Sequence, residues 1–200
     1  MTDQPALRIS NIVYGRQVVG NRVQYFVDPR GDGAERAVPE TVVLKRWRQR
    51  KLDGYSFSGT RLSSTLWRAI HLAFPLDAEK ICKLSPNEIH QTIERRRPAL
   101  EQHYFRVPSA ESLKALLCVV GPDRLISLMS RHTAANHAGH SGTPDLFLYA
   151  TNQTTGNPCV PRFVEVKKPG EKVSYDQRAE IKFLRDLGLH ARILRLIERK

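Results

Sequence analysis

The stretch GTPDLFLYA at residues 142–150 and the stretch FVEVKKPG at residues 163–170 predict two strands joined by a polar turn at residues 152–158. Pro144 favours extended backbone and suits the entrance of a strand, so Asp145 is expected where a loop enters a sheet. Glu165 and Lys167 are two residues apart, so their side chains leave the same face of the second strand. Two carboxylates and an ammonium group are therefore expected to address one site.

These residue types are the ones that metal-dependent phosphodiester hydrolysis requires. Carboxylate oxygens are the hard ligands that Mg²⁺ prefers, and a lysine can orient a water or neutralise charge on a phosphate. We expect Asp145 and Glu165 to bind the metal, the Val166 carbonyl to add a neutral ligand, and Lys167 to position the attacking water. The alternative is that they are ordinary surface charges on edge strands, because each short pattern is common.

The order of the motifs that follow resembles the virus-type replication-repair nuclease (VRR-NUC) family of the PD-(D/E)xK nucleases. A Gly-x-Pro-Asp-Leu segment, a Glu-Val-Lys strand, a Pro-Gly loop, Ser174-x-x-Gln177 opening a helix and Leu187-Gly188 ending it occur in that order. The resemblance implies an α/β fold with a restriction-endonuclease-like core, in which helices flank a mixed sheet. It also implies cleavage of DNA that depends on Mg²⁺, with Mn²⁺ as a substitute.

The resemblance assigns the catalytic residues one by one. Asp145, Glu165 and Lys167 match the motif residues, and Gln177 matches a residue on the helix that faces the site. Gln177 also lies three residues after Ser174, so it can return a capping hydrogen bond to the Ser174 backbone. The two roles of Gln177 are compatible.

A weaker likeness extends upstream, where residues 63–77 resemble the helical region that precedes this domain in Fanconi-associated-type nucleases. In those proteins a further glutamate usually joins the metal site, and here it is missing. The nearest equivalents are Gly59 and Thr60. Asp53 and Glu111 are the candidate substitutes, although Glu111 near a helix N-terminus also favours the helix dipole.

The remaining pattern divides the chain into an extension and a domain. Alternating residues in 7–43 predict a β-hairpin, so residues 1–52 are read as a β-rich, basic N-terminal extension. Residues 53–200 are read as the nuclease-type domain, with a helical part at 53–140 and a β-β-α-β core at 141–200. Ser85, Ser109 and Ser174 are predicted helix caps, and Pro122 a helix start.

A basic run, KRWRQRK at residues 45–51, surrounds Trp47. It either follows a phosphate backbone and stacks a base, or forms a solvated helix face with one anchored tryptophan. Arg95, Arg96 and Arg97 divide in the same way between phosphate contacts and a solvated helix end.

The net charge of +12 predicts a polyanionic partner, and nucleic acid is the expected one. A membrane is the weaker alternative, because no apolar run approaches the roughly 20 residues of a spanning helix. The N-terminus has neither a basic start nor an apolar stretch, which predicts no secretory signal and a cytoplasmic protein.

The cysteines and histidines do not form a regular metal-binding pattern. Cys82, Cys118 and Cys159 are far apart and odd in number, which predicts reduced, structural thiols. His132, His137 and His140 form a loose cluster that we expect to line the approach to Asp145 or to lie in a loop; a zinc site is the less favoured alternative.

Three biological roles remain open from the sequence. A nuclease of this kind could act on flaps or branched DNA in repair or recombination. It could instead be an antibacterial DNase toxin, delivered into a target cell and blocked by an acidic immunity protein. A non-catalytic nucleic-acid binder is the alternative from another class. Recognition by shape and charge is expected in each case, because no base-reading motif is present.

Overall fold

The computed structural model describes residues 9–19, 22–26, 38–75, 77–96, 98, 107–134 and 142–198. They form one sheet of six strands in the order β2-β1-β6-β5-β4-β3. The strands are β1 (Ile9–Val19), β2 (Arg22–Phe26), β3 (Tyr55–Arg61), β4 (Leu146–Asn152), β5 (Pro158–Lys167) and β6 (Ala191–Glu198). This is the mixed sheet that the sequence predicts.

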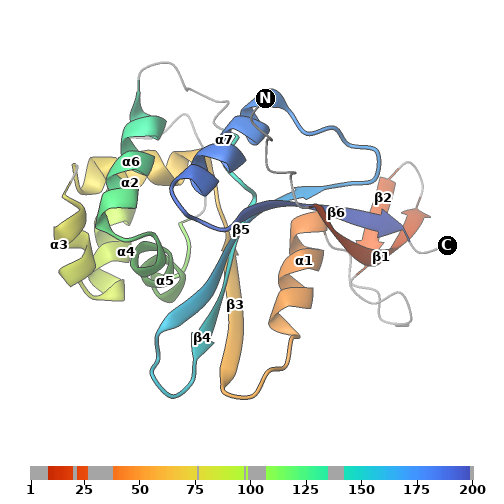
Figure 1. Cartoon of the computed structure of the whole chain (residues 1–200), viewed down its shortest axis with the longest axis horizontal. Coiled ribbons are helices and arrows are strands. Elements are labelled where there is room, and N and C mark those ends of the chain that lie inside the picture. Colours follow the sequence, from red (N-terminus) through yellow and green to blue (C-terminus); the bar gives the residue numbers. More distant parts are fainter. Residues whose placement is uncertain are drawn as a thin grey trace.

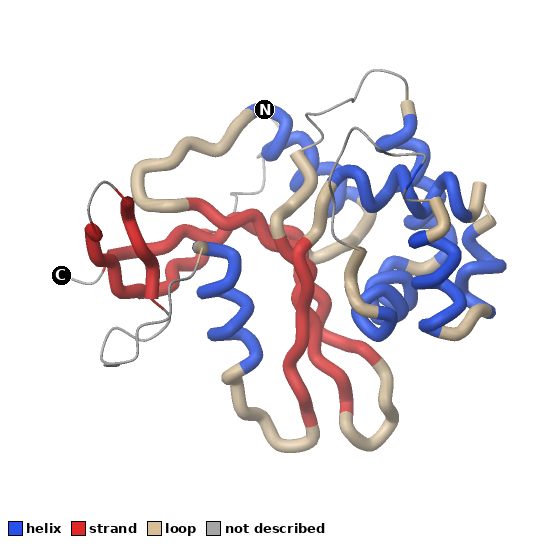
Figure 2. The backbone as a smooth tube through the Cα atoms, turned by 180° about the vertical axis from the view of Figure 1, so that it is seen from behind, coloured by secondary structure: helices blue, strands red, loops and turns tan. Residues whose placement is uncertain are grey.

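Helices cover both faces of the sheet (Figure 1). They are α1 (Pro39–Arg48), α2 (Ser64–Ala73), α3 (Ala78–Lys83), α4 (Pro86–Glu94), α5 (Ala110–Val120), α6 (Pro122–Thr133) and α7 (Tyr175–Asp186). Figure 2 shows from behind that α1 stands apart from the group formed by α2 to α6. The predicted α/β class, with helices flanking a mixed sheet, is confirmed.

Strand directions follow from the connections between strands. β4 and β5 form the predicted antiparallel hairpin, with Leu146 opposite Val164. β6 lies parallel to β5, with Glu165 beside Ile193, because α7 carries the chain back along the sheet before β6 begins. β1 is parallel to β6 and β3 is antiparallel to β4.

The central strands are apolar on both faces because both faces are covered. In β4, Phe147 and Tyr149 join the core beneath α2 to α7, whereas Leu146 and Leu148 join a second core beneath α1. This alternation sends every second side chain of a strand to the opposite helical layer. The same alternation in β5 determines which side chains reach the acidic site.

Two secondary-structure expectations are wrong. Residues 55–61, placed in the helical part, form the edge strand β3, which pairs with β4 along its whole length. Residues 39–43, placed in the β-hairpin region, begin α1 instead. Pro39 stands at its start, and Val43 and Trp47 repeat at helical spacing, so α1 packs an apolar side on the sheet.

The predicted helix caps are present. Ser85 forms a complete capping box with Glu88, and Ser109 accepts a hydrogen bond from the backbone N–H of Ser112. α6 begins at Pro122, as expected. The boundary predicted between residues 52 and 53 stays a prediction, although the sheet includes strands from both sides of it.

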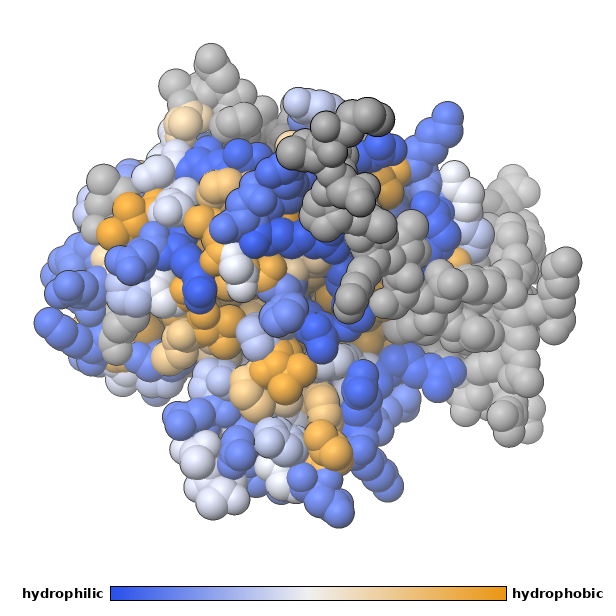
Figure 3. Space-filling model, in the orientation of Figure 1, coloured by the Kyte–Doolittle hydropathy of each residue, from blue (hydrophilic) through white to orange (hydrophobic). Residues whose placement is uncertain are grey.

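The basic run around Trp47 resolves into an anchored tryptophan. Trp47 is buried, and its indole N–H donates to the carbonyls of Ser58 and Tyr149, each at 2.9 Å. The ring is therefore held in the fold, and little of it is exposed. Hydrophilic residues predominate on the face seen in Figure 3 and surround separate small apolar groups. None of the helices in the described part of the chain has the length and apolar character needed to cross a bilayer.

Candidate active site

Asp145 lies at the start of β4, where the loop from residue 142 enters the sheet. Its Oδ2 accepts a 2.7 Å hydrogen bond from the backbone N–H of Val166. Its carbonyl accepts from the backbone N–H of Leu62, at 2.9 Å, just beyond β3. The aspartate is therefore tied to the strands on both sides of β4, and one of these ties is to the residue between Glu165 and Lys167.

A close contact with α7 holds the loop before Asp145. Gly142 has φ of +61°, and a Cβ at this position would lie 2.7 Å from the backbone nitrogen of Gln177 and closer still to the Asp176 carbonyl. Only glycine combines this left-handed conformation with such a close approach. The glycine of the Gly-x-Pro-Asp motif thus brings Asp145 and the first turn of α7 together.

Glu165 and Lys167 leave the same face of β5, as predicted from their spacing. They alternate with Val164 and Val166, which pack beneath α1. Both charged side chains are nearly inaccessible, with exposed fractions of 3% for Glu165 and 4% for Lys167, and Lys167 Nζ lies 2.9 Å from Glu165 Oε1. Buried charges of this kind require partners, and here each provides one for the other.

Gln177 performs both expected contacts at once. Its amide Oε1 accepts from the Ser174 backbone N–H at 3.0 Å, while the Ser174 hydroxyl accepts from the Gln177 backbone N–H at 3.2 Å. The Gln177 amide nitrogen also donates to Glu165 Oε1. The capping box of α7 therefore fixes a side chain that touches the acidic site.

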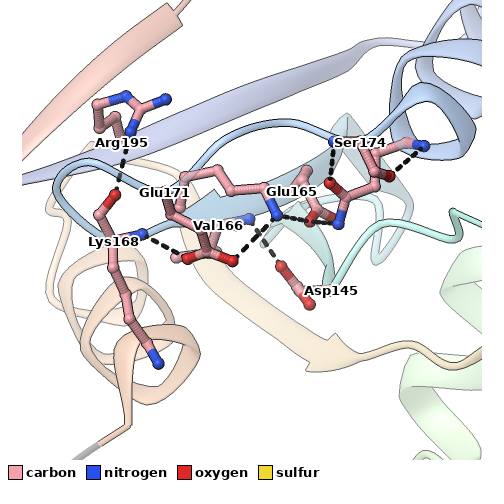
Figure 4. Close-up of polar contacts among 9 residues, drawn as sticks. Asp145, Glu165, Val166, Lys168, Glu171, Ser174 and Arg195 are labelled. Atoms are coloured by element: carbon pink, nitrogen blue, oxygen red, sulfur yellow. Dashed lines mark hydrogen bonds and ion pairs between the residues drawn. The ribbon is translucent and has the colours of Figure 1, made fainter.

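Glu171, which the sequence did not single out, completes the site from the loop after β5. Its carboxylate lies 3.3 Å from Lys167 Nζ and accepts from the Lys168 backbone N–H at 3.0 Å. The Asp145 carboxylate points to Val166, the Glu171 carboxylate points to the Lys168 backbone, and the Lys168 side chain points away (Figure 4). Arg195 of β6 donates to the Lys168 carbonyl at 3.1 Å and holds the loop from the other side.

The electrostatics of the cluster are those of crowded carboxylates. Burial, and after it the charge of Asp145, raise the pKa of Glu165 to about 7 against the opposing effect of Lys167. Burial also raises the pKa of Asp145; the Val166 N–H opposes this, and Glu40 and Glu171 add to it. Burial lowers the pKa of Lys167, but Glu165 and Glu171 outweigh that effect and raise it overall. Lys167 therefore stays protonated.

Glu40 is a second acidic residue that the sequence analysis did not single out. It lies in the first turn of α1, its charge acts on Asp145, and its Oε2 is 3.6 Å from an Nη atom of Arg61. The signal was available, because Pro39 followed by residues at helical spacing predicts a helix that starts beside Glu40. The alternating pattern that predicts β structure over residues 7–43 runs into the start of this helix.

The upstream positions considered from sequence do not supply this group. Gly59 has no room for a side chain, because a Cβ there would lie 2.8 Å from the Phe147 carbonyl and from the Leu148 side chain. Asp53 precedes β3 at the end that pairs with Asn152, away from Asp145. Glu111 is exposed in the first turn of α5, which fits its alternative role beside the helix dipole.

The model of the VRR-NUC domain matches residues 85–196, more than half of the chain. The chain belongs to the VRR-NUC family. This confirms the resemblance read from the order of the motifs.

The relatives of this VRR-NUC chain are longer proteins. A Fanconi-associated nuclease 1 homolog of Oryza sativa subsp. japonica is 33% identical over 120 residues, which cover 60% of this chain and 12% of the rice protein. Two crystal structures of paFAN1, bound to 2nt and to 1nt 5'flap DNA with gap, match with TM-scores of 0.61 and 0.54 at 13% identity. Each match covers this whole chain and 39% of the paFAN1 chain.

The donors in this VRR-NUC domain suit a divalent cation of the Mg²⁺ type. Glu165 is buried, Asp145 is half-buried, and the charge of Asp145 raises the pKa of Glu165, so a cation between the two carboxylates would relieve their repulsion. Within the described residues no three acidic, histidine or cysteine side chains are close enough to form a complete metal site. Mg²⁺ does not need one, because it keeps several waters and binds through one or two carboxylates.

The Val166 carbonyl faces the same position. In a strand, the N–H and C=O of one residue point to the same neighbour. The Val166 N–H points to Asp145, and β4 pairs with β5 only as far as Val164. The carbonyl of Val166 therefore leaves the strand on the side of Asp145, where the sequence-based hypothesis places a neutral ligand.

His132, one of the three histidines of the loose cluster, is not part of the described site. His132 is buried, and its Nε2 lies 3.0 Å from Glu180 Oε1, while Arg131 donates to Glu180 Oε2 at 2.6 Å. These contacts join α6 to α7. His137 and His140 lie outside the described residues. Cys118 and Cys159 are free thiols, as expected, and the side chain of Cys82 is not described.

Proposed function

We propose that this chain is a divalent-metal-dependent endonuclease that hydrolyses phosphodiester bonds of DNA at flaps or branches. The observation that supports this best is the hydrogen bond from the Val166 N–H to Asp145. It brings the aspartate of one motif against the Glu-Val-Lys strand of the other. Asp145, just before β4, and Glu165 of β5 then lie near a protonated lysine, and the charge of Glu40 in α1 acts on Asp145.

Asp145 and Glu165, with the Val166 carbonyl, are the groups that would hold Mg²⁺ or Mn²⁺. The metal ion supplies a Lewis acid and a water of lowered pKa. Lys167 acts as a hydrogen-bond donor and positive charge beside the attacked phosphate, because Glu165 and Glu171 keep it protonated. Gln177 orients Glu165, and Glu40 adds negative charge beside Asp145.

Flap or branched DNA is the proposed substrate for two reasons. The chain carries a net charge of +12, which favours a polyanion. The two matched structures of similar fold hold 5' flap DNA. Because this chain spans only a minor part of those proteins, their selectivity is extended to it as a proposal. A role in DNA repair is proposed on the same basis.

The test is cleavage of end-labelled linear, 5'-flap and four-way DNA by the purified chain with Mg²⁺, with Mn²⁺ and with a chelator. We expect cutting near the branch point in either metal and none with the chelator. Glu165→Gln and Lys167→Met should abolish it, whereas Asp186→Asn, an exposed carboxylate at the end of α7, should not. Equal cutting by wild type and both site variants would refute the assigned site.

The same assay separates the alternatives. The non-catalytic hypothesis rested on the missing upstream glutamate, and Glu40 now occupies the neighbourhood of Asp145. Absence of cutting on every substrate, together with tight DNA binding, would support the binder. The toxin and its acidic immunity protein stay a prediction. Lethality of the wild type in bacteria, relieved by Asp145→Ala, would favour that role over repair.

A further inference from the structure

A group of arginines lies on the opposite face of the sheet from Glu165. A cavity of about 270 Å³ opens between α1 and the central strands. Its floor is apolar and includes Leu148 and Val164, and its walls carry Arg46 of α1, Arg50 from the segment just after α1, and Arg192 of β6. We name these three residues, with the neighbouring Arg162 of β5, the arginine groove.

The fold makes the four arginines converge. Arg46 lies in the last turn of α1 and Arg50 follows just after the helix ends at Arg48, and both line the cavity. Arg192 sits beside Val164 in the parallel pairing of β5 and β6. Arg162 precedes Val164 by two residues and shares its face. Three elements thus direct guanidinium groups toward one apolar hollow.

Arg50 is held in place by aromatic rings. Its guanidinium lies 5.1 Å from the ring centre of Trp47 and 5.5 Å from that of Phe57. Trp47 is itself fixed by two hydrogen bonds to backbone carbonyls. A cation positioned in advance loses less conformational freedom when it binds an anion.

The groove accumulates positive charge. None of the described residues that line it is acidic. Burial lowers the pKa of Arg192, and the charges of Arg162 and Arg50 lower it further, which shows that these guanidinium groups repel one another. Such repulsion is relieved by a bound anion, and guanidinium groups bind phosphate oxygens in a bidentate manner.

We propose that the arginine groove binds the phosphodiester backbone of a DNA strand, at a site separate from the acidic centre. The choice of DNA rests on the proposed function. The apolar floor suits sugars or unpaired bases, and the arginines suit phosphates. α1 leads from Glu40 at the acidic centre to Arg46, a rise of about 9 Å along the helix, and Arg50 follows just beyond the end of α1. One DNA molecule can therefore reach both sites.

The test measures DNA binding without metal, so that cleavage plays no part. Fluorescence anisotropy of labelled single-stranded and duplex DNA is followed for the full chain in chelator over a range of salt concentrations. For the double variant Arg46→Gln/Arg50→Gln we expect the slope of log affinity against log salt to fall by about 1.4 to 1.8, since each phosphate contact contributes about 0.7 to 0.9. At low salt the affinity should fall about tenfold or more.

The control is Lys80→Gln/Arg124→Gln, which removes two exposed cations from α3 and α6 in the other helical layer. Its slope should equal that of the wild type. Arg46→Lys/Arg50→Lys keeps the charges and should restore most of the slope, which separates loss of charge from altered packing of α1. Arg192→Gln tests whether the arginine of β6 contributes to DNA binding. Equal losses in the groove variant and the control variant would overturn the proposal.

Competitors identify the ligand. Unlabelled DNA should displace the probe, whereas inorganic phosphate or a mononucleotide at the same phosphate concentration should not. Displacement by either small anion would make the groove a small-anion site and overturn the proposal. A larger loss for RNA than for DNA in the groove variant would overturn the choice of DNA. If the wild type does not cleave DNA but the groove variant still binds DNA more weakly than the wild type, only the proposed function is refuted.

Discussion

The carboxylate of Asp145 accepts a 2.7 Å hydrogen bond from the backbone N–H of Val166, the residue that separates Glu165 from Lys167. This bond joins the two sequence motifs directly. It also uses one Asp145 oxygen to fix the position of the carboxylate relative to β5. The charge of Asp145 and its hydrogen bond therefore have separable consequences.

Replacing Asp145 by asparagine should abolish activity without loss of stability. Asparagine keeps an oxygen that accepts from the Val166 N–H but has no charge to hold a metal, so cleavage should fall by roughly 100-fold or more. Asp145→Ala leaves the N–H without its partner and should cost about 1–3 kcal/mol in the free energy of unfolding. Chemical denaturation and single-turnover cleavage measure the two effects. Equal destabilisation by both variants would show that the hydrogen bond is not what holds the site.

Replacing Glu40 should impair cleavage where the other upstream carboxylates do not. Glu40→Gln removes the negative charge that acts on Asp145, and we expect cleavage to fall by about tenfold or more. Its stability should change little, because its contact with Arg61 is at the surface. Asp53→Asn and Glu111→Gln are the matched controls and should cleave at the wild-type rate. If cleavage is lost only in Asp53→Asn or only in Glu111→Gln, that residue and not Glu40 is the upstream carboxylate that the reaction needs.

Stabilisation by Mg²⁺ should increase with pH. The pKa of Glu165 is raised from its ordinary value of 4.5 to about 7, so in the metal-free protein its contribution to stability is present below pH 4.5 and is lost as the pH rises through about 7. A cation that replaces the proton should raise the melting temperature more at about pH 8 than at about pH 6. In Glu165→Gln this difference should disappear. An Mg²⁺ effect that is larger at the lower pH would contradict the assignment.

Substitutions of Gln177 should separate its helix-capping contact with Ser174 from its contact with Glu165. Gln177→Glu keeps an N3 acceptor for the Ser174 backbone N–H but places a carboxylate against Glu165, so the acidic limb of the pH–rate profile should move to higher pH. Gln177→Ala loses the cap and should cost about 1 kcal/mol of stability. Asp176→Asn, an exposed neighbour, should leave the profile in place. If Gln177→Glu leaves it in place as well, the contact with Glu165 has no role in the reaction.

Replacement by alanine should be more destabilising at Gly142 than at Gly156, which also has a positive φ but has no atoms close to an added Cβ. Gly142→Ala combines positive φ with a collision against the first turn of α7, so we expect a loss of about 2 kcal/mol or more and impaired cleavage. Gly156, in the turn between β4 and β5, has φ of +70° and nothing within 4 Å of an added Cβ. Gly156→Ala should cost only the strain of about 1–2 kcal/mol. Equal losses in thermal or chemical unfolding would show that the contact with α7 contributes nothing.

Local patterns were sufficient wherever the determining interaction is local. The Ser174 and Gln177 capping box depends on residues three apart, and the common face of Glu165 and Lys167 depends on strand geometry alone. The β4–β5 hairpin followed from two apolar runs and a polar turn. The ordered motifs were also specific enough to identify the family.

Local patterns misled where neighbours in space decide. Residues 55–61 form a strand because β4 offers its edge, and Trp47 is buried because α1 closes over Leu148 and Val164. Neither partner is close in the sequence. The same holds for Glu180, whose buried carboxylate pairs with His132 across two helices and removes that histidine from the predicted cluster.

The proximity of Asp145, Glu165 and Lys167 was thus predictable from sequence alone, because their order and spacing reflect strand entry and strand periodicity. Only the tertiary structure brought Glu40 to Asp145 and gathered four arginines on the opposite face of the sheet. It also raised the pKa of Glu165 to about 7. The physical reason is that burial and the sum of nearby charges depend on which distant segments pack together, and no local pattern encodes that.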